Sequence, residues 1–137
     1  RAFVRMVNPK SIKAVINIEM IGTVNSVGRN EFMVTGGNES DLAEILKKNL
    51  KQDKIKVTPL TYDPRLLFER SDNYPFALEA IPAHTIMCSD DKEECYHKPC
   101  DDADRLDIDN MTKIINAIAK GSLPLAEGTV TPRLKRK

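Results

Sequence analysis

The feature that most constrains the fold of this 137-residue sequence is an apolar run, KAVINIEMI, at Lys13 to Ile21. Most of its residues are β-branched or otherwise apolar, and Gly22 ends it. A run of this kind, with no strict alternation of polar residues, predicts a central β-strand covered on both faces. The run also holds one carboxylate, Glu19, which would be costly to bury as an ion without a partner.

The rest of the sequence alternates between strand and helix patterns. In chain order we expect a strand over Glu31 to Thr35, a helix capped by Asn38 and running to about Lys51, and a strand over Lys54 to Val57. A short helix over Tyr74 to Glu79 and a strand over Pro82 to Met87 follow. The last helix is capped by Asp107 or Asp109 and stops at Gly121 and Pro124, and its core stripe is Met111, Ile114, Ile115 and Ile118. This alternation predicts an α/β fold, a three-layer sandwich in which helices flank a mainly parallel (mixed) sheet. The length and the 41% hydrophobic content suit one such domain, assigned to residues 1–125, followed by a basic tail at 126–137 that we expect to be solvated.

Polar residues gather where two of the predicted strands end. Glu19 lies near the end of the first strand, and His97 follows the strand at Pro82 to Met87. Open α/β sheets bind ligands beyond the carboxyl ends of their strands, so these two side chains are candidate metal ligands. Each also has a plainer interpretation: Glu19 could meet water or a basic residue, and His97 could be a surface residue. Asp101 could orient a metal-bound imidazole or complement the dipole of the following helix.

Four short motifs, taken in order, resemble one family of enzymes. They are Asn17-Ile18-Glu19-Met20-Ile21-Gly22, Arg70-Ser71-Asp72-Asn73-Tyr74-Pro75-Phe76, Ala80-Ile81-Pro82-Ala83 and Tyr96-His97-Lys98-Pro99-Cys100-Asp101. They are similar to Asn-Leu-Asp-Met-x-Gly, Ser-Asp-His-x-x-Phe, Gly-Ile-Pro-Ala and Tyr-His-x-x-x-Asp of the zinc metallopeptidases of the aminopeptidase Y and bacterial leucyl aminopeptidase type. The resemblance extends from Lys13 to about Ile118 and implies a zinc-exopeptidase fold.

The resemblance implies a role for each matched residue. Glu19 corresponds to the terminal carboxylate ligand of one zinc ion, and His97 to the histidine ligand of the other. In the family, two zinc ions share a bridging Asp and a bridging water, and a Glu acts as the general base. The other matched residues are implied to lie beside the metals or in the substrate pocket: Ser71, Asp72, Asn73, Phe76, Tyr96 and Asp101.

The sequence departs from the family pattern in three ways. Glu19 stands where Asp is usual, and Asn73 stands where His is usual. The His-x-Asp motif, the bridging Asp and the Glu-Glu pair precede the segment of Glu19 in the family, but only 18 residues precede it here. We therefore expect this sequence to be the C-terminal half of a zinc aminopeptidase domain, inactive by itself. The peptide substrate and the two zinc ions would bind only when the missing N-terminal half is present or when the chain associates with itself.

Two other functions remain open on the same fold. One is a glutaminyl cyclase, which resembles these peptidases but uses one zinc ion. The other is a metal-free, peptidase-like binding domain of the kind found in receptor ectodomains. A metal analysis of the complete protein would separate the three possibilities.

Charge and cysteine content give further expectations. The balance of 21 Lys and Arg against 20 Asp and Glu gives no electrostatic reason to expect a nucleic-acid partner, and no apolar run is long enough to span a membrane. Among the three cysteines we expect a disulfide between Cys88 and Cys95, because the polar loop between them is short. A disulfide would suit a periplasmic or secreted protein.

Overall fold

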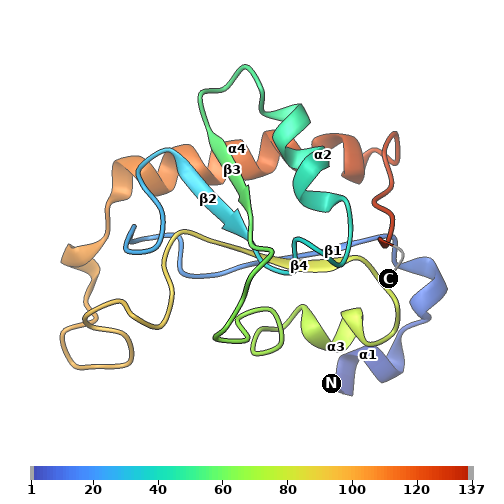
Figure 1. Ribbon diagram of the computed structural model, residues 1–137, viewed down its shortest axis with the longest axis horizontal. Coiled ribbons are helices and arrows are strands. Elements are labelled where there is room, and N and C mark those ends of the chain that lie inside the picture. Colours follow the sequence, from blue (N-terminus) through green and yellow to red (C-terminus); the bar gives the residue numbers. More distant parts are fainter. Residues whose placement is uncertain (1, 136–137) are drawn as a thin grey trace.

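The computed structural model describes residues 2–135, in which a four-stranded sheet lies between helices (Figure 1). The elements are α1 (Ala2–Met6), β1 (Val15–Ile18), β2 (Glu31–Val34), α2 (Leu42–Asn49), β3 (Lys56–Pro59), α3 (Tyr74–Ala77), β4 (Ala83–Met87) and α4 (Ile108–Ala126), with short 3-10 turns at Pro9–Ser11 and Ala103–Arg105. The strand order is β1-β4-β2-β3. The pairs β1–β4 and β2–β3 are parallel, and β2–β4 is antiparallel. The predicted α/β fold with a mixed sheet is confirmed.

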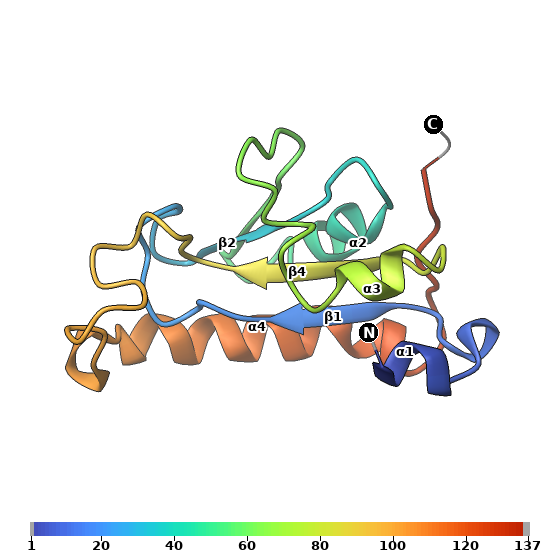
Figure 2. The ribbon, with the colours of Figure 1, turned by 90° about the horizontal axis from the view of Figure 1, so that it is seen from below.

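Alternate residues of the inner strands build two different cores. Phe32 and Val34 of β2 and Ile86 of β4 are fully buried against α2 and α4. Met33 and Met87 point to the opposite face, where they pack with residues of the 60–67 segment. This is the period of two expected for strands covered on both sides. In Figure 1, α2 and α4 lie above β1 and β4 and α3 lies below them, and Figure 2 shows α4 running alongside β1.

The first strand differs from its prediction. It is shorter than Lys13 to Ile21, and among residues 2–135 its only strand neighbour is β4. Its side chains are half-buried or exposed, and Ile18 is 48% exposed. With one strand neighbour, the apolar run is an edge strand of the described sheet and not a central one. Its side chains stay partly exposed, because β4 and α4 cover only part of its surface.

The last helix also differs, because it continues past its predicted stop. Gly121 lies inside α4, where a side chain would meet Leu50 at 3.2 Å, so the glycine permits close packing of α4 on α2. Pro124 falls in the last turn, where the loss of one backbone hydrogen bond ends the helix soon afterwards. Ile115, predicted as core, is 47% exposed, because the buried stripe of α4 follows Ile114, Ala117 and Ile118.

Several element boundaries shifted by a few residues. Asn38 does not cap α2; its side chain donates to Thr61 O at 2.7 Å, and the helix starts after Asp41. Strand β3 includes Pro59, which an edge strand tolerates. The short helix at Tyr74 ends at Ala77.

The predicted solvated tail is bonded to the domain over its described part. Arg133 N donates to Asp41 Oδ1 at 2.7 Å, and Asp41 N donates to Arg133 O at 3.0 Å. Leu134 forms a β-bridge with Ser40, and Lys135 pairs with Glu44 at 2.8 Å. The backbone of this segment finds partners at the start of α2, whereas the side chains of residues 133–135 are exposed to solvent.

Candidate active site

The segments that follow β1 and β4 meet at one edge of the sheet. The carbonyl oxygen of Met20, just beyond β1, accepts hydrogen bonds from the backbone N–H of Cys88 and Ser89, both at 3.1 Å. The Ser89 hydroxyl donates to the same oxygen at 3.0 Å. Because β1 and β4 are parallel neighbours, Glu19 and the loop that carries His97 leave the sheet on the same side.

Glu19 is in direct contact with the segment that precedes α3. The Ser71 hydroxyl donates to Glu19 Oε1 at 2.5 Å, and it also lies 3.0 Å from Leu67 O. The two residues are 52 positions apart in the sequence. The structure therefore brings together the strand-end carboxylate and the Ser-Asp segment that the family resemblance associates with it.

Ion pairs hold the 62–73 segment, which carries Ser71, against the loop after β4. Arg65 bonds Asp90 at 2.7 Å and Asp91 at 2.6 Å, and Arg70 bonds Asp91 at 2.7 Å. Burial by itself would raise the pKa of Asp90, but hydrogen bonds and the Arg65 guanidinium together lower that pKa to about 2. Both aspartates are therefore ionised at neutral pH, and the segment is fixed beside Glu19.

His97 lies on a loop closed by a disulfide, and the pairing differs from the predicted one. Cys95 is bonded to Cys100, not to Cys88. Cys88 continues the inward pattern of β4 into the core, and burial raises the pKa of its thiol to about 11. Within the loop, His97 is exposed, has a left-handed φ of 55° and stacks on the Tyr96 ring at a centroid distance of 3.9 Å.

A cavity of about 250 Å³ opens beside this loop. Tyr96, His97 and Asp101 form one wall, and the others come from the segments after β1 and β4 and from the turn before α4: Met20, Gly22, Thr23, Ser89, Glu93 and Leu106. Arg105 holds Glu93 at 2.7 Å and lowers its pKa, so the Glu93 carboxylate is ionised. The cavity combines apolar surface with acidic groups.

Five of the residues implied by the family resemblance do not line this cavity: Glu19 and Ser71, which contact each other, and also Asp72, Asn73 and Phe76. Asp72 is exposed. Asn73 is fully buried; its side chain donates to Ala83 O at 3.2 Å and accepts from the Thr85 hydroxyl at 2.9 Å, which attaches the start of α3 to β4. Phe76 packs against Phe3, with ring centroids 6.3 Å apart.

Some residues of the site are not predicted by the sequence patterns. Met20, Ser89 and Leu106 line the cavity without having been singled out. For Met20 a signal existed, since it follows Glu19 directly within a matched motif. Leu106 had none, because it reaches the cavity only through the course of the loop before α4.

The residues of the described chain do not complete a zinc site by themselves. Between residues 2 and 135, no three His, Cys, Asp or Glu side chains gather closely enough to hold a metal ion. A catalytic zinc ion usually has three protein ligands. Glu19 and His97 can therefore contribute at most part of a ligand set.

Comparison with known proteins agrees with this geometry. The family model for peptidase family M28 matches residues 1–121. The chain belongs to peptidase family M28. The family is named for its peptidases, which are generally zinc-dependent. No protein in the curated comparison matches the chain significantly.

Solved structures share the fold. Two structures of the Legionella pneumophila aminopeptidase LapA superpose with TM-scores of 0.71 and 0.70 at 23% and 22% identity, over 90% of this chain. The aminopeptidase from Aneurinibacillus sp. strain AM-1 gives 0.65 at 13% identity over 98% of the chain. The chain spans only 30–35% of the length of these proteins. Among residues 2–135, none of the helices combines the length and apolar character that a bilayer crossing requires.

Proposed function

We propose that this M28 chain is the C-terminal part of a zinc-dependent aminopeptidase domain, which removes N-terminal residues from peptides. In this proposal Glu19 is a ligand of one zinc ion and His97 of a second. The supporting observation is the hydrogen bond from Ser71 to Glu19 Oε1 at 2.5 Å, because it presents the strand-end carboxylate at the edge where the His97 loop also lies.

The residues of this chain have separate tasks in the proposed enzyme. Bound zinc would activate a water molecule and polarise the scissile carbonyl group. Ser71 orients Glu19, and the disulfide between Cys95 and Cys100 constrains the loop of His97. The cavity beside His97 receives the side chain of the substrate residue, and Met20, Tyr96 and Leu106 favour an apolar one.

The remaining ligands and the general base come, in this proposal, from residues outside the motifs matched here. The N-terminal half of the domain would supply them along the free edge of β1, or a second copy would associate there. This chain alone is then inactive. The disulfide also supports a periplasmic or secreted location, where such bonds persist.

Zinc content and activity of the complete protein test the proposal. We expect two zinc ions per complete domain, hydrolysis of leucine p-nitroanilide that a chelator abolishes, and loss of one zinc ion together with activity in His97→Ala and in Glu19→Ala. Glu79→Gln, an exposed carboxylate two residues after α3, is the matched control and should retain both. Full activity in the His97 variant would refute the ligand assignment.

The same measurements separate the other functions on this fold. One zinc ion with cyclisation of N-terminal glutamine would indicate a glutaminyl cyclase. No bound zinc in a folded protein would indicate a binding domain without peptidase activity.

A further inference from the structure

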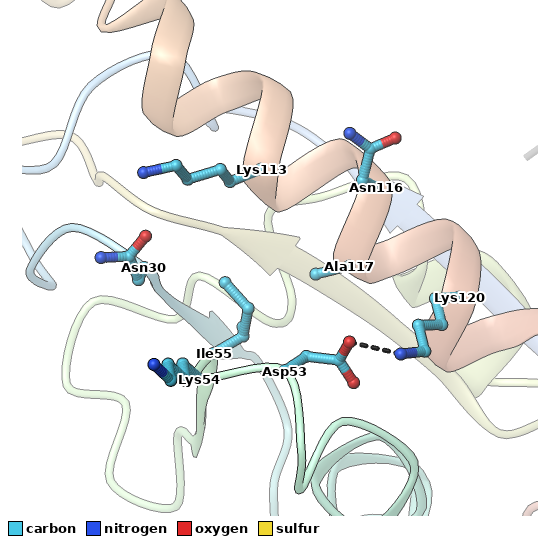
Figure 3. Close-up of a pocket in the computed structure, with 8 residues that line it drawn as sticks. All are labelled: Asn30, Asp53, Lys54, Ile55, Lys113, Asn116, Ala117 and Lys120. Carbon is cyan, nitrogen blue, oxygen red and sulfur yellow. Dashed lines mark hydrogen bonds and ion pairs between the residues drawn. The ribbon is translucent and has the colours of Figure 1, made fainter.

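A second and larger cavity, of about 540 Å³, lies between α4 and the turns that lead into β2 and β3 (Figure 3). Its lining is Asn30, Asp53, Lys54, Ile55, Lys113, Asn116, Ala117 and Lys120. None of these residues lines the cavity at His97. The volume lies within the usual range for small-molecule sites.

The charge of this cavity is not balanced. Lys120 forms an ion pair with Asp53, so that the one acidic side chain of the lining is already neutralised. Lys54 and Lys113 form no ion pair with any residue in the range 2–135. Two ammonium groups on a concave surface attract an anion more strongly than scattered surface lysines do.

The polar groups of the cavity are arranged at opposite ends. In Figure 3 the Asp53–Lys120 pair lies at one end, whereas Lys113, Asn30 and Lys54 lie toward the other. Ile55 and Ala117 provide apolar surface in the same lining. A ligand that fits would carry an anionic head and a small apolar body.

The end of the cavity that carries Lys113 and Lys54 has a defined backbone framework. Asn30 N donates to Asn110 Oδ1 of α4 at 2.7 Å, and Asn110 is 1% exposed. Asn30 and Lys54 both have left-handed φ angles, of 58° and 55°. The turn before β2 is thus attached to the helix that carries Lys113, and the distance between the two sides of the cavity is set by the fold.

We infer that this cavity binds a small organic anion through a phosphate or carboxylate group held by Lys113, Lys54 and the amide of Asn30. The inference does not depend on the proposed peptidase activity, because the cavity shares no residue with the candidate active site.

Titration of the full chain, followed by amide NMR spectra, tests this site. The probes are phenyl phosphate and phenylacetate, with benzyl alcohol as the neutral control, all at constant ionic strength. We expect saturable shifts at Asn30, Lys54 and Lys113 with one or both anions and none with the alcohol. Comparison of the two anions shows whether phosphate or carboxylate is preferred.

Two variants with a matched control decide the result. Lys113→Gln and Lys54→Gln should each weaken anion binding about tenfold, whereas Lys48→Gln, an exposed lysine of α2 outside the cavity, should leave it unchanged. Both variants change exposed side chains, so we expect them to fold. A dispersed amide spectrum, recorded before the titration, checks that they do. Equal binding by Lys113→Gln and Lys48→Gln, equal binding of benzyl alcohol, or shifts spread over lysines throughout the surface would overturn the inference.

Discussion

Removal of the Arg65 guanidinium should destabilise the protein, because it holds two carboxylates of the loop after β4. Arg65 bonds Asp90 at 2.7 Å and Asp91 at 2.6 Å. The side chain of Asp90 is only 8% exposed, so its charge has little water to replace the guanidinium. Arg65→Met keeps much of the apolar stem of the side chain and removes the charge.

The magnitude follows from the pKa of Asp90. That pKa is about 2 in the folded protein, against an ordinary value of 3.8. A difference near two units corresponds to about 2 kcal/mol of folding free energy. Because Ser26 and the backbone of Lys92 also help to lower this pKa, we expect Arg65→Met to lower the free energy of unfolding by up to about 2 kcal/mol at neutral pH.

The pH dependence gives the sign of the effect. A carboxyl group with a lowered pKa stabilises the fold above its unfolded pKa and loses this contribution as the pH falls toward its folded pKa. Urea unfolding of the wild type and of Arg65→Met should therefore differ most near neutral pH. The difference should narrow as the pH falls from about 4 to about 2.

Two controls isolate the interaction. Arg29→Met breaks an ion pair with Asp107 in which Arg29 is 54% exposed, and it should cost less than about 1 kcal/mol. The double variant Arg65→Met/Asp90→Asn should recover part of the loss, because no buried charge is then left unpaired. A loss in Arg65→Met no larger than in Arg29→Met, or one independent of pH, would refute the reasoning.

Three further predictions concern the fold and the His97 loop. Burial lowers the pKa of His84, so the unfolded chain binds a proton more readily; stability in urea should fall as the pH drops below about 6.5, and this decrease should be absent in His84→Gln. Gly121→Val should lower the thermal unfolding midpoint through a loss of about 1–3 kcal/mol by overpacking against leucines of the α2 region, whereas Gly28→Ala, with open space around it, should change the midpoint little. Cys95→Ser should lose about 2 kcal/mol of unfolding free energy in urea and expose the loop to proteases, and Cys95→Ser/Cys100→Ser should behave the same because either change breaks the bond; a stable, resistant variant would contradict a structural role.

Local patterns predicted most elements of the fold but not how the strands associate. The apolar runs predicted all four strands of the described sheet within a few residues, because buried strands are rich in apolar residues. The antiparallel pairing of β2 with β4 could not be predicted in this way, since strand direction depends on the course of the connections. The edge position of β1 was missed for the same reason, because an apolar run does not reveal how many neighbours a strand has.

The candidate site was predicted only in part. The order of the motifs pointed to Glu19 and Ser71, which the fold brings into contact. The disulfide was predicted incorrectly because the prediction used only the length of the loop between Cys88 and Cys95. Cys88 extends the apolar strand and belongs to the core, whereas Cys95 and Cys100 share a polar loop, and this difference was visible in the sequence.

The contact between Ser71 and Glu19 has a consequence for conformational entropy. A free glutamate side chain loses up to about 2 kcal/mol of rotamer freedom when it is fixed in one orientation. Here the Ser71 hydroxyl holds Oε1 within the protein's own fold, and Oε2 lies outside that bond. The orientation of the carboxylate is thus selected during folding, so a cation that binds Glu19 would not have to order a mobile side chain.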